Sequence, residues 1–142
     1  MNPRPAIMVP GWAVLLVAGN VLAAAPRAPA PDEATLRRGE QVYARCIACH
    51  AIEANRTGPQ HCGLFGRRAG TAPGFTGYSK ALRESKIVWN AQTLDRFLQD
   101  PMKAVPGTTM GYAGVKDPKE RADLIAWLGV ATRPGQGCTP ER

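Results

Sequence analysis

The stretch Cys46-Ile47-Ala48-Cys49-His50 decides how the rest of the chain is interpreted. A C-x-x-C-H arrangement is typical of c-type haem attachment. On a helical turn, residues three and four apart share a face, so both thiols can meet the haem vinyl groups while the histidine reaches the iron. A zinc half-site or a redox dithiol would need a second ligand pair or a βαβ surround, and neither is visible. The sequence therefore predicts one covalently attached haem c, held by Cys46 and Cys49, with His50 as an axial ligand of the iron.

The sixth coordination position of the iron has three candidate ligands, His61, Met102 and Met110. Met110 lies in a Gly/Pro-rich loop without helical or strand period, which is an unusual place for a methionine that only fills a core. Met102 ends an amphipathic segment, where an exposed or packing role is the default. His61 stands eleven residues after His50, so we expect it on the same side of the haem, as a partly exposed polar residue.

The first 25 residues have the layout of a secretory signal. Arg4 is their only charge, an apolar run follows, and small residues surround an expected cleavage near Ala23/Ala24. We therefore expect residues 1–23 to be removed. The alternative is an uncleaved N-terminal segment that anchors the protein in a membrane. The apolar run is shorter than the ~20 residues that a span needs, which favours cleavage.

Residues 24–31 alternate proline with small residues and predict an extended linker. The folded domain is expected at 32–132, with a C-terminal tail at 133–142. Export would place the protein in an oxidising compartment, where cysteines can pair as disulfides. Cys62 and Cys138 are the two cysteines that remain outside the C-x-x-C-H motif. A disulfide between them would close a loop of about 76 residues, worth on the order of 4 kcal/mol. The alternatives are two unrelated thiols, or Cys138 joined to another chain.

The composition fits one modest domain. The length of 142 residues excludes a large α/β enzyme with separate cofactor and substrate domains. The chain is 44% hydrophobic but only 6% aromatic, and 15 glycines and 13 prolines indicate that much of it is loop. A haem would replace the missing aromatic core. The net charge of +7 would steer the protein toward acidic docking surfaces, with Arg45, Lys103 and Lys116 at the predicted haem edge. Export and the lack of a basic-aromatic stripe argue against nucleic-acid binding.

Helix start signals predict an all-α fold, because no convincing alternating strand is present. The expected helices are one that begins at Asp32 and runs toward Cys46, a short one at 79–84, one at 91–98 that ends before Pro101, and a last one that begins at Asp117 and stops at Gly129. Three main helices, a short helix and long loops would then wrap around one covalent haem.

Residues 33–132 resemble a small bacterial class I c-type cytochrome, the type that includes mitochondrial cytochrome c. The motifs run in family order: Gly39, Cys46-x-x-Cys49-His50, Thr57-Gly58-Pro59, Gly63-Leu64-Phe65-Gly66-Arg67, Gly74-Phe75, Trp89, Pro106-Gly107-Thr108-x-Met110 and residues 121–128. The resemblance implies the cytochrome c fold, Met110 as the sixth ligand, and a close crossing of the first and last helices at Gly39.

The resemblance also implies roles around the haem. The Pro59 carbonyl would accept a hydrogen bond from His50, Thr108 would help to hold the methionine loop, and three residues would contact a haem propionate: Arg67, Tyr78 and Trp89. Three features depart from the family pattern. Phe97 stands where mitochondrial members carry a tyrosine, Gly77 is inserted before Tyr78, and Gln60-His61-Cys62 puts a cysteine where a structural histidine often sits. Met102 and Thr109 also replace docking lysines.

With His50 and Met110 both bound, the iron would have no vacant position, so the expected function is electron transfer rather than catalysis. We expect a periplasmic, monomeric one-electron carrier without stable membrane insertion after processing. Its redox partners would be a cytochrome bc complex, a terminal oxidase or a periplasmic dehydrogenase. The alternative is a dedicated haem-c subunit of a periplasmic dehydrogenase complex. A haem-based sensor or peroxidase would require Met110 to be labile.

Overall fold

The computed structural model describes residues 29–135 and residue 138. It contains five helices in this range: α1 (Glu33–Tyr43), α2 (Lys80–Glu84), α3 (Ala91–Gln99), α4 (Pro101–Ala104) and α5 (Pro118–Ala131). Within the described residues no strand forms, and extended pairing is limited to two isolated bridges. The predicted all-α fold is therefore confirmed. The predicted signal segment at 1–23 lies outside the described residues, and so do most of the linker and much of the tail.

The predicted helix starts are confirmed, because each is set by a local cap. The Asp32 carboxylate accepts a hydrogen bond from the Thr35 amide at 2.7 Å, and the Asp117 carboxylate accepts one from Glu120 at 2.8 Å. Asn90 exchanges two hydrogen bonds with Thr93 in a capping box. These side chains satisfy backbone amides that have no partner within the helix.

The predicted helix ends are less accurate. The first helix ends at Tyr43, before Cys46. The last helix continues through Gly129 to Ala131, so the predicted stop is wrong. A glycine in a helix costs about 1 kcal/mol, but Gly129 is not in the left-handed conformation that ends a helix, and packing of the same helix offsets that cost.

Helix α4 was not predicted from the sequence, because Pro101 was interpreted only as the end of the preceding helix. The Asp100 carboxylate accepts a hydrogen bond from the Lys103 amide at 3.2 Å, and Pro101 occupies the first turn of α4. A proline is tolerated there because that position needs no intrahelical amide hydrogen bond. Asp100 and Pro101 therefore end one helix and begin the next.

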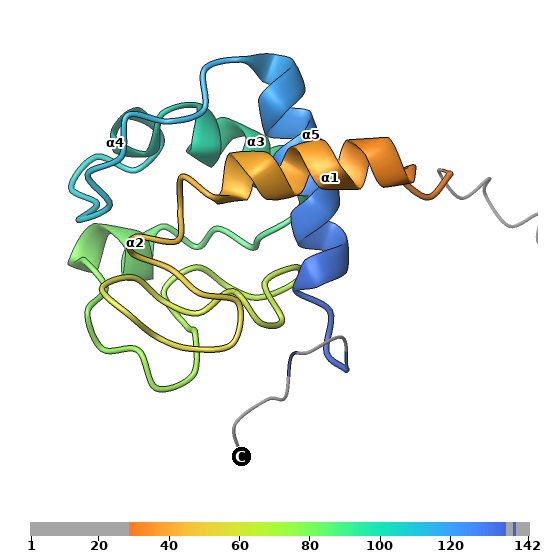
Figure 1. Ribbon diagram of the computed structural model, residues 1–142. Helices are drawn as coiled ribbons and strands as arrows, with labels where there is room; N and C mark the ends of the chain where they lie inside the picture. Colours follow the sequence, from red (N-terminus) through yellow and green to blue (C-terminus); the bar gives the residue numbers. More distant parts are fainter. Residues whose placement is uncertain (1–28, 136–137, 139–142) are drawn as a thin grey trace, which may run out of the picture.

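Helices α1 and α5 cross at a glycine, as predicted for Gly39. A Cβ atom on Gly39 would lie 2.2 Å from the Asp123 carbonyl oxygen and 2.5 Å from Cβ of Trp127. Figure 1 shows α1 crossing α5, with α3 beside α5. The long loop between α1 and α2 forms the other side of the molecule and faces these helices across its interior.

Among the described residues, no helix has both the length and the apolarity required to cross a membrane.

Candidate functional site

An apolar cavity of about 80 Å³ lies between the helices and the loops. Its walls include Tyr43, Leu64, Leu82, Trp89, Leu94, Phe97, Leu98, Leu124 and Leu128. A second hollow shares Cys46, His50, Tyr78, Leu82 and Met110 with it and extends to Cys49 and Tyr112. The two hollows form one crevice, which a flat apolar group could enter edge first.

The C-x-x-C-H stretch forms a helical turn at the edge of this crevice. The amides of Cys49 and His50 both donate to the Cys46 carbonyl, at 3.1 and 2.9 Å. Cys46 and His50 line the inner cavity, while Cys49 is exposed and lines only the outer hollow. Burial raises the pKa of the Cys46 thiol. The predicted attachment residues thus lie together on one side of the crevice.

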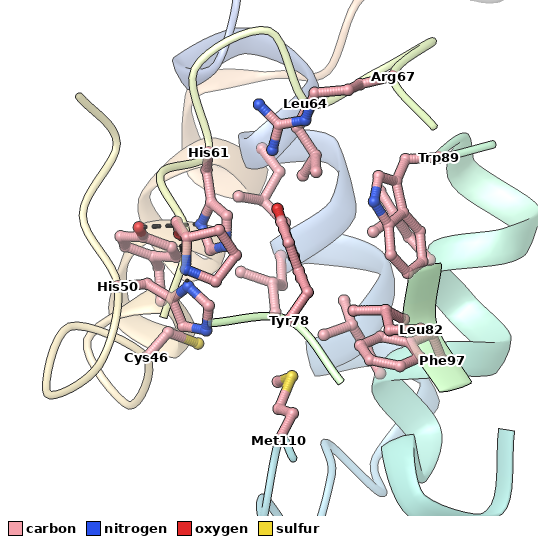
Figure 2. A pocket seen from close by; sticks show the side chains of 16 residues that line it. Cys46, His50, His61, Leu64, Arg67, Tyr78, Leu82, Trp89, Phe97 and Met110 are labelled. Atoms are coloured by element: carbon pink, nitrogen blue, oxygen red, sulfur yellow. Dashed lines mark hydrogen bonds between the residues drawn. The ribbon is translucent and has the colours of Figure 1, made fainter. Parts of the chain in front are cut away.

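The His50 ring is oriented by a single hydrogen bond. Its Nδ1 lies 2.8 Å from the Pro59 carbonyl oxygen, and because a carbonyl can only accept, Nδ1 carries the proton. Nε2 then carries the free lone pair, and it lies on the side of the ring that faces the cavity (Figure 2). Burial lowers the pKa of His50, which favours the neutral, metal-binding form of the ring. The predicted partnership with Pro59 is therefore present in the geometry.

Gly58 is a residue whose role was not predicted from the sequence. A Cβ atom there would lie 2.4 Å from Cε1 of His50. The ring could not occupy its position beside any larger residue. The available signal was a glycine next to Pro59, within the same loop that was expected to orient the histidine.

His61 lies on the same side of the cavity as His50, as predicted, but the sequence did not predict its packing role. The two rings stack with centroids 4.4 Å apart and an interplanar angle of 22°. Nδ1 of His61 is hydrogen-bonded to the Tyr43 hydroxyl at 3.1 Å. Burial lowers the pKa of His61 well below its usual range, so the ring is neutral. The His61 ring packs against the His50 ring on the same side of the cavity and does not lie across the cavity from it.

Met110 reaches the cavity from a loop held by its own backbone. The Thr108 hydroxyl oxygen accepts from the Met110 amide at 3.3 Å, and the Thr108 amide donates to the Val105 carbonyl at 3.0 Å. Gly107 has a φ of +90°, a conformation that favours glycine. Figure 2 shows the Met110 sulfur directed into the same cavity as the His50 ring. Met102, by contrast, is 60% exposed on α4 and does not line the cavity.

Three polar side chains lie at the far end of the cavity: Arg67, Tyr78 and Trp89 (Figure 2). The Arg67 guanidinium donates to the carbonyls of Cys62 and Gln60 at 2.6 and 2.9 Å. Its Nε is buried and has no hydrogen-bond partner among the described residues. The Tyr78 hydroxyl accepts from the Ala72 amide at 3.1 Å, which leaves its own proton free to be donated. An apolar crevice that ends in unused donors fits a haem with its propionates at that end.

Phe97 is buried in the wall of the cavity, with its ring 5.0 Å from that of Trp89. As predicted, it offers no hydroxyl to the methionine sulfur. The inserted Gly77 does not displace Tyr78 from the cavity.

The cations at the predicted haem edge are partly neutralised. Arg45 makes two 2.7 Å hydrogen bonds to the Glu120 carboxylate. Lys116 lies 3.1 Å from the Asp100 carboxylate. The positive potential at this edge is therefore weaker than Arg45 and Lys116 would produce without their carboxylate partners.

Comparison with known proteins agrees with this geometry. The family model described as cytochrome c matches residues 36–131. The chain is 48% identical over 109 residues to cytochrome c of Chlamydomonas reinhardtii, covering 74% of this chain and 94% of that protein. It is 42% identical over 102 residues to cytochrome c2 of Rhodomicrobium vannielii, covering 70% and 79%. Among solved structures, cytochrome cH from Methylobacterium extorquens is similar, with a TM-score of 0.64 and 42% identity, covering 66% of this chain and 96% of that one.

Proteins of this family are electron carriers that bear one covalently attached haem c. They are not enzymes, and their partners are other redox proteins. The chain belongs to the cytochrome c family and is an electron-transfer haem protein.

Proposed function

We propose that this protein is a periplasmic one-electron carrier that shuttles between redox proteins, with its haem attached to Cys46 and Cys49 and its iron ligated by His50 and Met110. The observation that carries this proposal is the convergence of His50 and Met110 on one apolar cavity that also contains the Cys46 thiol. Haem c supplies an iron centre that changes oxidation state by one electron.

The residues of the chain would keep that centre closed to other chemistry. Pro59 fixes the His50 tautomer so that Nε2 is the metal ligand. The Thr108 hydroxyl holds the backbone of Met110, which favours a methionine that stays in place. A soft thioether together with a neutral imidazole would favour the ferrous state and raise the reduction potential relative to more donating ligands. With His50 and Met110 both bound, the iron would have no position for oxygen or a substrate.

Apolar side chains would exclude water from the site. Leu64, Leu94 and Leu124 are each no more than 4% exposed, and they surround the cavity. Apolar, closely packed surroundings would rearrange little between the oxidised and reduced states of the haem iron. Such surroundings favour rapid transfer of one electron. On the side of the crevice where Cys49 is exposed, the haem would approach the surface of the protein. We propose this edge as the route of the electron.

Cell fractionation and native purification test the proposal. We expect the protein in the periplasmic fraction, cleaved near Ala23/Ala24, as a haem-bearing monomer that titrates with one electron. Membranes that contain a cytochrome bc complex or a terminal oxidase should change its oxidation state. Purification only as a stoichiometric complex with a periplasmic dehydrogenase would contradict the shuttle and support the dedicated subunit. Retention in membranes after a salt wash would support the uncleaved anchor.

A further inference from the structure

The two cysteines outside the C-x-x-C-H turn meet where the chain leaves α5. Cys62 is 8% exposed and Cys138 is 1% exposed. The Cys138 thiol lies beside the Cys62 thiol and the Gly63 amide. Two buried sulfurs from widely separated segments thus share one small site, apart from the cavity described above.

Backbone hydrogen bonds hold both sides of this site. The Cys62 amide donates to the Ile52 carbonyl at 2.7 Å, and the Arg67 guanidinium binds the Cys62 carbonyl. The Gly63 amide donates to the carbonyl of Thr132, directly after α5, at 2.7 Å. The Cys138 carbonyl accepts from the Gly135 amide at 3.1 Å, and the residue pairs with Pro134 in an isolated bridge. The meeting of the two cysteines is therefore set by the fold around them.

The Cys138 thiol has little else to bind. Among the residues that the structure describes, its one other polar contact is a weak 3.9 Å approach to the Ala131 carbonyl. Replacing the S–H group by a sulfur–sulfur bond would therefore forfeit only this weak contact. A thiol pair in an exported protein is ordinarily oxidised when the sulfurs can meet.

We propose that Cys62 and Cys138 form an intramolecular disulfide that fastens the chain beyond α5 to the loop between Pro59 and Arg67. The proposal rests on the export included in the proposed function. Each thiol loses one hydrogen, a sulfur–sulfur bond forms, and two electrons and two protons pass to a second disulfide, which leaves as two thiols. The co-reactant is a protein oxidant of the thiol–disulfide exchange class, and the haem takes no part.

The disulfide would act on the loop that orients His50. Pro59 accepts the His50 hydrogen bond from one end of this loop, and Cys62 lies three residues further along. Fixing the loop at Cys62 restricts how far the Pro59 carbonyl can move from the ring. Burial and the adjacent Cys62 raise the pKa of Cys138 to about 12, so the thiolate needed for exchange is scarce once the tail is packed. The disulfide should therefore form before the tail packs. Because both sulfurs are buried, external reductants should reach the bond slowly in the folded state.

Thiol labelling of the haem-bearing, exported protein tests the disulfide directly. The cells are quenched in acid, and the protein is unfolded and alkylated with and without prior reduction. We expect no label without reduction and two labels after it, on Cys62 and Cys138, with a mass gain of two hydrogens on reduction. Two labels without reduction would overturn the proposal, and so would a disulfide-linked dimer. Label on Cys46 or Cys49 would instead indicate failed haem attachment, and so failure of the proposed function.

Matched variants test what the disulfide does. The single variants Cys62→Ala and Cys138→Ala should each expose one labelled thiol, and the double variant none. With the iron kept reduced in all samples, prolonged reduction should lower the thermal midpoint of the wild type toward that of the double variant, which should not change. A thiol reductant should also cleave the wild-type bond at least tenfold faster in denaturant than in the folded protein. A wild-type midpoint that prolonged reduction leaves unchanged would refute the fastening role.

Discussion

At the residue scale, the site depends on small differences in side-chain volume around His50. Gly58 lies against one side of the imidazole and His61 stacks on another, while Pro59 sets the tautomer. These three contacts fix the position and the orientation of the ring. This explains why a loop with little regular structure can present a ligand accurately.

Replacing Gly58 tests this placement. In Gly58→Ala the new methyl group would lie 2.4 Å from Cε1 of His50, so the ring must move or the loop must shift. We expect a lower yield of haem-bearing protein and a loss of stability of about 1–3 kcal/mol, measured by haem absorbance per chain and by denaturant unfolding.

Gly129→Ala is the matched control for this substitution. A Cβ atom there meets nothing closer than 3.6 Å, and helix propensity predicts a gain of up to about 1 kcal/mol. Equal haem yield and equal stability in both variants would refute the fitted position of the histidine.

At the element scale, the crossing of α1 and α5 combines a glycine contact with a buried carboxylate. Asp123 is 6% exposed and accepts from Arg38 at 2.7 Å and from Lys119 at 2.9 Å. The same helix places Arg121 against α3, where its guanidinium bonds to Asp95 at 2.6 Å and to the Val115 carbonyl at 2.8 Å. Polar side chains thus hold α1, α3 and α5 together around the apolar interior.

A larger residue at position 39 should separate the helices. In Gly39→Val the side chain would meet backbone and Trp127 atoms well inside contact distance. We expect a loss of at least about 2 kcal/mol in the free energy of unfolding. Glu40→Ala, at an exposed position in the same helix, should change it by less than about 0.5 kcal/mol. A stable Gly39→Val protein with an unchanged denaturation midpoint would show that the crossing is not close.

The Asp123 carboxylate should contribute to acid sensitivity. Hydrogen bonds from Arg38 and Lys119 lower its pKa in the folded protein below the ordinary value of 3.8. Its stabilisation is therefore complete above pH 3.8 and is lost as the pH falls through the lower folded value. In Asp123→Asn we expect lower stability at neutral pH, by about 1–3 kcal/mol, and a shallower decline below pH 4. Parallel acid unfolding curves for the variant and the wild type would contradict this role.

The extent to which the sequence predicts these elements follows from how local each signal is. Caps such as Asp32 and Asp117 act within one turn, so the starts of the helices are predictable. Gly129 and Pro101 can each either end a helix or be accommodated in one, so the residue type alone does not predict that α5 continues past Gly129 or that α4 begins at Pro101. The Arg121–Asp95 pair joins positions on two helices, so the local pattern of neither helix predicts it.

The site shows the same division. The C-x-x-C-H turn and the Gly/Pro-rich methionine loop are contiguous motifs, and their residues could be named from the sequence. The stacking of His61 on His50 and the contact of Gly58 depend on how the loop folds back, which no spacing encodes. The pairing of Cys62 with Cys138 was predicted from the even number of remaining cysteines, as a link between the C-terminal tail and the loop after His50, and it stays a prediction.

At the scale of the whole molecule, the low aromatic content agrees with an interior that contains an apolar cavity for a haem. Buried side chains of α1, α3 and α5 pack on one another, and several of them, such as Tyr43, Leu94 and Leu124, also line the cavity. The chain therefore has a shell of helices and loops whose stability depends on what fills it. A covalent haem serves as both the cofactor and the largest part of the core.

Removing the haem should therefore unfold much of the protein. In the double variant Cys46→Ala, Cys49→Ala we expect a far weaker helical circular dichroism signal and greater exposure of hydrophobic surface. The physical reason is the loss of apolar contacts along the whole cavity wall. Cys62→Ala, which leaves the attachment pair intact, is the control and should keep its helix signal. A native helix signal in the haem-free double variant would show that the polypeptide core suffices.

If His50 and Met110 both ligate the iron, they close it to other ligands, and the visible and near-infrared spectrum reports this ligation. The oxidised wild type and Met102→Ala should show a sulfur-to-iron charge-transfer band, and their reduced forms should not change when carbon monoxide is added. Met110→Ala should lose the band and bind carbon monoxide. A wild type without the band, or a Met110→Ala variant that keeps it, would show that Met110 does not ligate the iron.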